Sequence, residues 1–335
     1  MGDALVCKIA IIDSGIDLDF YKNHVIKYVE YAEETGDESE YDSNGHGTLC
    51  CSAMLSINPA IQFVVIKILN EKNLCSDERL LRALNLLKDV DVDIINLSLS
   101  TYSMAFSEQY KKIVADLAAQ GKVIIAAAAN GNIDSLLSGL RGTIGIYGNL
   151  FESPDDYWYK KTDEVQCVAN CVPYLYRGKR GQYELFGGNS KATAVFSGIV
   201  SLHWDKIKNC SFADKETFLE GLAKRQSWSK EDICLNPLSI KEYTVESVRD
   251  EIYLKVADIM AEKLKVSLND VMNSKGKHLY EWGLTRYNVF GIVKAIEKEI
   301  GIKLTYSNIN IFWFSSIDTL CNKIREAKDN LKSYE

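Results

Sequence analysis

The chain has 335 residues, of which 47% are hydrophobic and 25% are charged, and its formal net charge is −7. This composition is typical of a soluble globular protein with room for one large and one small domain. The negative charge argues against a nucleic-acid partner, because phosphate binding requires clustered lysine and arginine. No apolar run is long enough to cross a bilayer, which argues against a membrane partner.

The cysteines bear on the compartment. Nine are present without a Cys-x-x-Cys pair, and Cys50 and Cys51 are adjacent. This pattern argues against a zinc site and a disulfide framework, so we expect buried thiols in a reducing compartment. The first predicted strand follows Met1 almost at once, so we expect neither a signal peptide nor an inhibitory propeptide. Together these features predict a cytoplasmic protein.

Strands and amphipathic helices alternate along the first two thirds of the chain. We predict strands at 6–13, 61–68, 94–99, 123–129, 141–148 and 165–172, and helices at 49–55, 77–89, 108–120, 192–200 and 215–224. Such alternation implies right-handed crossovers, so we expect an α/β fold whose mostly parallel sheet is covered by helices on both faces. The acidic residues 33–42 are expected to form a solvated loop, with a calcium site as the weaker alternative. Residues 153–159 are expected to form an inserted aromatic loop.

The last third of the sequence is helical. Residues 226–245 have the mixed, proline-containing character of a linker. Apolar residues then recur with helical spacing, which predicts a small antiparallel bundle of the four-helix type. We therefore expect a catalytic domain at 1–225, a linker at 226–245 and a helical domain at 246–335.

One serine lies between a glycine-rich turn and a helical apolar run. It is the third residue of Gly188-Asn189-Ser190-Lys191-Ala192. A serine in a first helical turn is ordinarily an N-cap. It becomes a nucleophile only when a positioned base takes its proton and a carboxylate orients that base. The role of Ser190 therefore depends on whether the chain supplies both groups.

Two upstream segments supply a carboxylate and a base. Asp13 ends the first predicted strand, at the edge where open α/β sheets build their sites. His46 lies between two glycines in the sequence Asn-Gly-His-Gly-Thr. Taken singly, Asp13 has an ordinary interpretation as a strand-end cap, and His46 as a loop histidine. Together with Ser190 they give the chain order Asp, His, Ser of the subtilisin triad.

Over about residues 5–205 the sequence resembles the subtilisin-like serine peptidases, or subtilases. The segments around the three residues above match its catalytic motifs, residues 93–100 resemble the strand that pairs with substrate, and residues 123–132 resemble the strand that ends in the oxyanion asparagine. The resemblance implies an acyl-enzyme mechanism. The implied catalytic residues are Asp13, His46, Ser190 and Asn130, and the implied substrate-binding residues are Ser98, Leu99, Ser100, Ala128 and Ala129.

The sequence departs from the family pattern beside these motifs. Asn189 and Lys191 replace the threonine and methionine that usually flank the serine. Ser100 and Ala129 stand where the family often has glycine, so we expect a shallow pocket for a small residue before the cut. Asn132 remains a second candidate for the oxyanion donor. None of these departures removes a catalytic group.

Residues 246–333 resemble an acyl carrier protein. Trp282-Gly283-Leu284 precedes the second helix, as in carriers, but Arg286 occupies the position of the serine that holds phosphopantetheine. The resemblance therefore implies no pantetheine arm, with Thr285 as a weaker attachment site. We expect no cofactor and no metal ion.

Together, the two resemblances imply a function in bacterial peptide maturation. The chain is expected to be an intracellular serine endopeptidase that removes the leader from a ribosomally made precursor peptide. The carrier-like domain would dock this precursor or a peptide-modifying partner enzyme, although a bundle that only stabilises the catalytic domain is the ordinary alternative. Two further alternatives are a peptide ligase or macrocyclase that uses the same acyl-enzyme, and a catalytically silent subtilase fold that serves as a binding scaffold.

Overall fold

The computed structural model describes residues 6–31, 41–129, 135–234, 247–274 and 277–332. The chain forms two compact units. Unit 1 comprises Met1–Cys171, Arg177–Gly181 and Gly187–Leu235, and unit 2 comprises Val172–Tyr176, Gln182–Phe186 and Asn236–Glu335.

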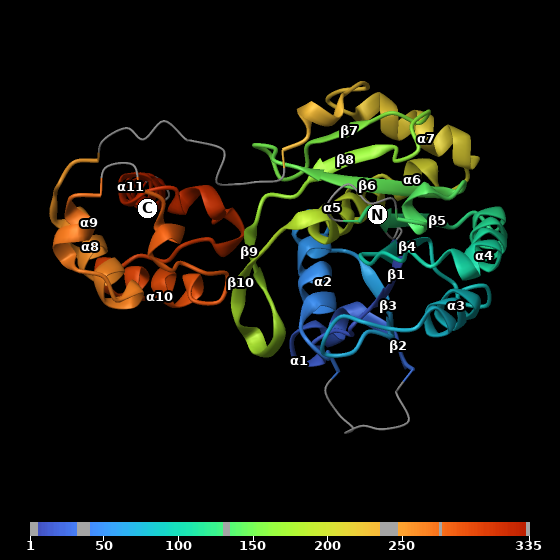
Figure 1. Cartoon of the computed structure of the whole chain (residues 1–335), viewed down its shortest axis with the longest axis horizontal. Coiled ribbons are helices and arrows are strands. Elements are labelled where there is room, and N and C mark those ends of the chain that lie inside the picture. The colour runs from blue at the N-terminus through green and yellow to red at the C-terminus, as the bar shows by residue number, and fades with distance from the viewer. Residues whose placement is uncertain (1–5, 32–40, 130–134, 235–246, 275–276, 333–335) are drawn as a thin grey trace. The chain divides into compact units, whose positions relative to one another are not determined.

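Unit 1 is built around an eight-stranded sheet with the strand order β2-β3-β1-β4-β5-β6-β8-β7 (Figure 1). Neighbouring strands run parallel except β7 and β8, which are antiparallel. Because β1 and β4 are neighbours, the residues at their carboxyl ends lie at one edge of the sheet. The strands are β1 (Lys8–Asp13), β2 (Val25–Glu30), β3 (Gln62–Lys67), β4 (Ile94–Leu97), β5 (Val123–Ala127), β6 (Thr143–Asn149), β7 (Tyr157–Tyr159) and β8 (Cys167–Asn170).

Helices cover the sheet on both faces. On one face α2 (His46–Ile57) packs against α5 (Gly188–Leu202), and α5 also contacts β4, β5, β6 and β8. The other face is covered by α3 (Asp77–Leu86) and α4 (Ser107–Ala119), whose apolar residues join those of β1, β3, β4 and β5 in one core (Figure 1). The predicted α/β class with a mostly parallel, doubly covered sheet is confirmed. The shorter helices of this unit are α1 (Leu18–Tyr21), α6 (Trp204–Ile207) and α7 (Phe212–Leu222).

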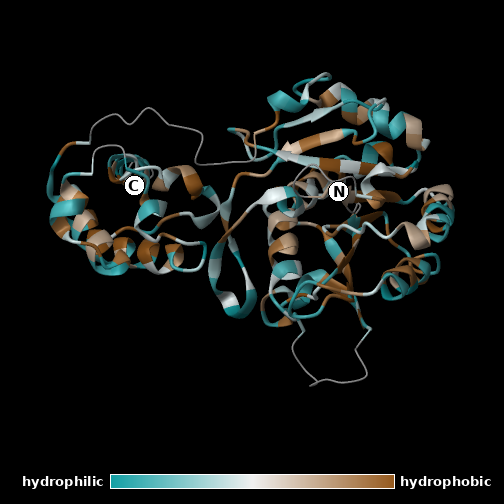
Figure 2. Ribbon diagram, viewed as in Figure 1, coloured by the Kyte–Doolittle hydropathy of each residue, from teal (hydrophilic) through white to brown (hydrophobic). Residues whose placement is uncertain are grey.

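The central strands are almost wholly apolar because both of their faces are buried. Every residue of β5 is buried, as is every residue of β1 after Lys8. Figure 2 shows these strands largely in brown, the colour of hydrophobic residues. None of the helices within the described ranges is both long enough and apolar enough to span a bilayer.

The aromatic segment at the sheet edge differs from the prediction of a loop at 153–159. Its last three residues form β7, which pairs antiparallel with β8. Tyr157 and Tyr159 are buried and pack on Phe196, whereas Trp158 between them is only partly buried. The loop prediction is therefore wrong for these three residues. Alternate side chains of a strand point to the same face, so Tyr157 and Tyr159 both face the core.

The segment predicted as a linker packs in part on unit 1. Asn149 Nδ2 donates to the carbonyl of Asp232 at 3.3 Å, and the Cys234 N–H donates to Asn149 Oδ1 at 2.8 Å. The chain therefore stays attached to the sheet domain as far as residue 234. The remainder of the predicted linker, to residue 245, lies outside the described residues.

Unit 2 contains the C-terminal helices and a two-stranded sheet. The helices are α8 (Glu251–Leu264), α9 (Leu268–Met272), α10 (Val289–Ile300) and α11 (Ile317–Lys332), and the strands are β9 (Tyr174–Arg177) and β10 (Tyr183–Phe186). The ring of Tyr183 packs on those of Phe290 and Tyr306, with centroids 5.1 and 4.7 Å apart. The unit thus differs from the contiguous domain predicted at 246–335, because it also includes 172–176 and 182–186 and its C-terminal part begins at Asn236.

Candidate active site

Asp13 is the last residue of β1 and is completely buried. Its Oδ1 accepts the N–H of Ser14 at 2.7 Å. His46 Nδ1 lies 2.8 Å from Oδ1 and 3.0 Å from Oδ2 of the same carboxylate. The structure therefore brings together the predicted carboxylate and the predicted base, at the carboxyl edge of the sheet.

His46 is the first residue of α2 and interacts closely with Asp13. An Nδ1–H that donates to the carboxylate leaves Nε2 as the proton acceptor. Burial acts to lower the pKa of His46, but the charge of Asp13 and the hydrogen bond to it outweigh burial and raise this pKa well above 6.5. The imidazolium that forms during general-base catalysis is therefore stabilised by Asp13.

Two glycines allow His46 to approach Asp13. Gly45, the N-cap of α2, has a φ of 95°, a conformation that a side chain disfavours. At Gly47 an added Cβ would lie 2.1 Å from the carbonyl oxygen of Gly15. The glycine-flanked histidine motif thus has a steric reason in this fold.

Asp42 organises the same region, and the sequence prediction for it is wrong. It was predicted in the solvated loop at 33–42, yet it is only 2% exposed. Its Oδ1 accepts the Ser14 hydroxyl at 2.7 Å and the Gly45 N–H at 2.8 Å, and its Oδ2 accepts the N–H and hydroxyl of Thr48. Asp42 therefore ties the end of β1 to the start of α2. Of the predicted loop only Tyr41 and Asp42 lie in the described part of the chain, and Tyr41 is exposed.

Ser190 is the third residue of α5 and is half-buried. Its hydroxyl donates to the carbonyl of Ser98 at 3.0 Å, and the Ser98 hydroxyl donates to the carbonyl of Ser190 at 3.1 Å. Ser98 follows β4, the neighbour of β1, so the predicted nucleophile lies at the same sheet edge as the pair of Asp13 and His46.

Cys50 connects these two groups of residues. Its Sγ lies 3.9 Å from His46 Nδ1, and its thiol also interacts with the Ser98 side chain. Asp13, His46 and Cys50 are the one group within the described ranges whose ligand atoms approach as a metal site requires, within 4.8 Å. Burial raises the pKa of the Cys50 thiol. No feature of the sequence predicted this contact between Cys50 and His46.

The other predicted substrate-binding residues are placed in part. Ser98, Ala128 and Ala129 are buried, Leu99 is half-buried and Ser100 is exposed. The segment after β4 thus becomes progressively more accessible from Ser98 to Ser100. Asn130 and the alternative oxyanion donor Asn132 lie outside the described residues.

Lys191, which follows Ser190, is completely buried. Its Nζ donates to the backbone carbonyl of Asn170 at 3.0 Å and to Asn170 Oδ1 at 2.9 Å. Burial lowers the pKa of Lys191 from 10.5 to about 7. Where the family usually has methionine, this chain therefore has a buried lysine with hydrogen bonds to Asn170. Its burial was not predicted from the sequence.

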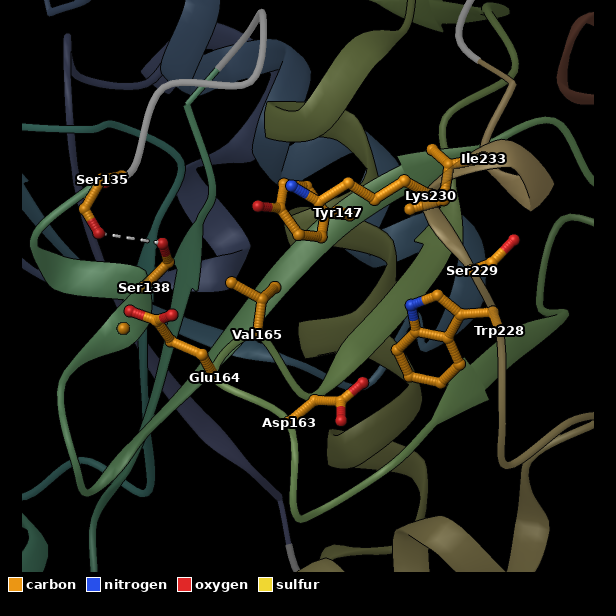
Figure 3. A pocket seen from close by; sticks show the side chains of 11 residues that line it. Ser135, Ser138, Tyr147, Asp163, Glu164, Val165, Trp228, Ser229, Lys230 and Ile233 are labelled. Atoms are coloured by element: carbon orange, nitrogen blue, oxygen red, sulfur yellow. Dashed lines mark hydrogen bonds between the residues drawn. The ribbon is translucent and has the colours of Figure 1, made fainter.

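A cavity of about 260 Å³ lies elsewhere in unit 1 (Figure 3). Its lining includes Ser138, Glu164 and Trp228, and it contains none of the predicted site residues. Trp228 comes from the segment predicted as a linker, which therefore closes the wall of this cavity. We assign the cavity no role in catalysis.

In unit 2, Arg286 lies in the turn that precedes α10. Its Nε is 3.3 Å from Glu184 Oε2, and its carbonyl accepts the Leu185 N–H at 3.4 Å. The next residue, Tyr287, is 71% exposed, and its ring lies under the Arg286 guanidinium at 4.5 Å. Arg286 therefore contacts β10 through both its side chain and its backbone carbonyl.

The chain is similar to known proteins in sequence family and in fold. The Subtilase family model matches residues 6–250. Among solved structures, a cold-adapted subtilisin-like serine proteinase shares 16% identity and a TM-score of 0.55, over 69% of this chain and 86% of its own. A lanthipeptide protease shares 18% identity and a TM-score of 0.56, over 68% and 83%. Sphericase shares 18% identity and a TM-score of 0.52, over 66% and 86%.

These structural similarities concern the fold, since the identities are low. No curated protein sequence matches this chain. The family match, however, covers more than half of the chain and includes all three motifs from which the site was predicted. The chain belongs to the subtilase family and is a serine peptidase, a hydrolase.

Proposed function

We propose that the chain is an endopeptidase in which Ser190 is the nucleophile, His46 the base and Asp13 the orienting carboxylate. The observation that carries this proposal is the 2.8 Å contact between His46 Nδ1 and the buried Asp13 carboxylate. It holds the imidazole in the tautomer that accepts a proton at Nε2. For attack, the Ser190 hydroxyl exchanges its hydrogen bond to Ser98 for one to His46.

The proposed reaction is acyl transfer to water. The substrate peptide lies extended beside residues 98–100 and 128–129, and main-chain pairing sets its register. Ser190 Oγ bonds to the scissile carbonyl carbon while His46 accepts its proton. The resulting oxyanion is received by the Ser190 N–H and the Asn130 amide. His46 then protonates the leaving amine, and water releases the acyl group from Ser190.

The proposed substrate is a ribosomally made precursor peptide, from which the enzyme removes the leader in a bacterial cytoplasm. Two features support this substrate: the structural similarity to a lanthipeptide protease, and the carrier-like sequence of residues 246–333. Buried thiols such as Cys50 and Cys167 are typical of a reducing compartment. We propose that unit 2 docks the precursor or a modifying partner enzyme, without a pantetheine arm.

Labelling with a fluorophosphonate, measured by intact mass, tests the catalytic assignment. We expect one adduct on the wild-type protein and none on Ser190→Ala or His46→Ala, because the first lacks the nucleophile and the second lacks the base. Lack of labelling of the folded wild type, under conditions that label a control peptidase, would favour the binding-scaffold alternative.

Mass analysis of peptide products tests the substrate assignment. Candidate precursors encoded near the gene are incubated with the wild type and with Ser190→Ala. One cut at the leader boundary, with gain of one water across the two products, supports leader removal. Products whose masses add up to that of the precursor, one of them one water lighter than the corresponding linear hydrolysis product, support the ligase or macrocyclase, because the acyl group then passes to an amine. Cuts distributed along the whole precursor would contradict a leader peptidase.

A third experiment tests unit 2. The protein is incubated with coenzyme A and a phosphopantetheinyl transferase, and its intact mass is measured. We expect no gain in mass, since Arg286 offers no hydroxyl. A phosphopantetheine adduct at Thr285 would contradict the proposal.

Docking is tested by precursor binding to Tyr287→Ala, with Leu254→Ala as the control for loss of an exposed side chain on the same unit.

A further inference from the structure

Asn189, which precedes Ser190, replaces the family's threonine and makes three hydrogen bonds. Its side chain is buried, with only 4% of the residue exposed. Its Nδ2 donates to the carbonyls of Ala128 at 2.9 Å and Ala129 at 3.3 Å. Its Oδ1 accepts the N–H of Gly148 at 2.9 Å. One amide therefore satisfies backbone groups from two different segments.

These backbone groups lie where β5 and β6 reach the catalytic edge. Ala128 and Ala129 follow β5 and lead directly into Asn130, while Gly148 is the penultimate residue of β6. The fit is close, because a Cβ added at Gly148 would lie 2.9 Å from Asn189 Oδ1. Asn189 thus joins the start of α5 to the ends of two neighbouring strands.

We propose that Asn189 is a positioning residue for acyl transfer: it fixes the carbonyls of Ala128 and Ala129, which precede the proposed oxyanion donor in the sequence, relative to Ser190. This inference deepens the proposed function and rests on it. An oxyanion donor acts only when it is held at hydrogen-bond distance from the developing charge, and a misplacement of about 1 Å can cost about 10²-fold in rate. A threonine hydroxyl has one proton to donate, so it cannot hold both carbonyls at once.

The test is the kinetics of phosphonylation by a fluorophosphonate. In this reaction Ser190 Oγ bonds to phosphorus, the P–F bond breaks, fluoride leaves and His46 takes the serine proton. The phosphoryl oxygen occupies the oxyanion position. For Asn189→Ala we expect the maximal labelling rate to fall about 10- to 100-fold. The half-saturating concentration should change by less than about threefold, because ground-state binding is retained.

Asn58→Ala is the matched control. Asn58 is also a buried asparagine that bonds to α5, since its Nδ2 donates to Ser201 Oγ at 2.9 Å. Ser201 is close to the C-terminal end of α5, whereas Ser190 is close to its N-terminal end. Its loss should lower the thermal midpoint, as the loss of Asn189 does, and leave the labelling rate within about twofold of wild type. Asn189→Thr, which keeps one donor, should label at a rate between those of wild type and Asn189→Ala.

The outcomes separate this inference from the proposed function. Labelling of the wild type at Ser190 establishes the nucleophile independently of Asn189. Wild-type rates in both Asn189 variants would then overturn the positioning role, and so would an equal loss in Asn58→Ala. If Asn189→Ala does not fold, a rate reduction in folded Asn189→Thr supports the role and a wild-type rate refutes it. An unlabelled wild type would overturn the proposed function and this inference with it.

Discussion

Replacing Lys191 by methionine should remove much of the pH dependence of stability. Lys191 is completely buried between Ser190 and the Asn170 oxygens that its Nζ contacts at 2.9 and 3.0 Å. Burial lowers its pKa from 10.5 to about 7. Methionine is the residue that usually occupies this position in the family, and it fills a similar volume without a charge.

The sign of the effect follows from proton binding. Between about pH 7 and pH 10.5 the unfolded lysine holds a proton that the folded lysine has lost. The unfolded state therefore binds more protons, and the free energy of unfolding rises with pH across this window. The full interval corresponds to about 5 kcal/mol. Between about pH 6 and about pH 9 the expected rise is about 2.7 kcal/mol.

Urea unfolding at a series of pH values measures this effect. From about pH 6 to about pH 9 the free energy of unfolding of the wild type should rise by about 2.7 kcal/mol more than that of Lys191→Met. All other titrating groups are common to both proteins. Lys72→Met, which removes an exposed lysine, should leave the pH dependence unchanged. Parallel pH profiles for wild type and Lys191→Met would refute the argument.

Three further substitutions test the site and the helical unit. Asp13→Asn should lower kcat by about 10⁴. Because the carboxylate raises the pKa of His46, the acid limb of the residual pH–rate profile should also move to lower pH, and an unmoved limb would contradict this coupling. Gly47→Ala should abolish labelling by a fluorophosphonate and lower the thermal midpoint, since the added Cβ would lie 2.1 Å from the Gly15 carbonyl oxygen. Normal labelling would show that the backbone moves to accommodate the methyl group. Gly291→Ala should raise the free energy of unfolding by about 0.5–1 kcal/mol, because this helical glycine has no neighbour within 4 Å of an added Cβ; a lower stability in urea would show that the site is constrained.

The sequence was sufficient where the signal is local. Residues 9–12 and 123–127 are apolar throughout, which predicts strands buried on both faces. The motif glycines predict close backbone approach, and the structure places Gly47 against the carbonyl of Gly15. The pairing of Asp13 with His46 was likewise expected from the order of the motifs. Short motifs predict the site here because acyl transfer requires particular residue types, and the close approach of His46 to Asp13 requires glycine at fixed positions beside the histidine.

The sequence was insufficient where burial depends on distant partners. Asp42 belongs to an acidic stretch, and its burial follows from its bonds to Ser14 and Thr48, which lie in two other segments. Nothing near Lys191 in the chain indicates that Asn170 will receive its ammonium group. The strand pairing of residues 157–159 also depends on β8, which follows later in the chain.

The sequence by itself determined the family, the fold class and the identity of the candidate triad, because these depend on motifs and on local hydrophobic periodicity. Only the tertiary structure decided which polar groups lose contact with water and which backbone atoms they then hold. Asn189 is the clearest example: its residue type marks a departure from the family, but its bonds to Ala128, Ala129 and Gly148 exist only once β5, β6 and α5 are assembled. The physical reason is that a buried polar side chain must find hydrogen-bond partners, and those partners come from segments far away in the chain.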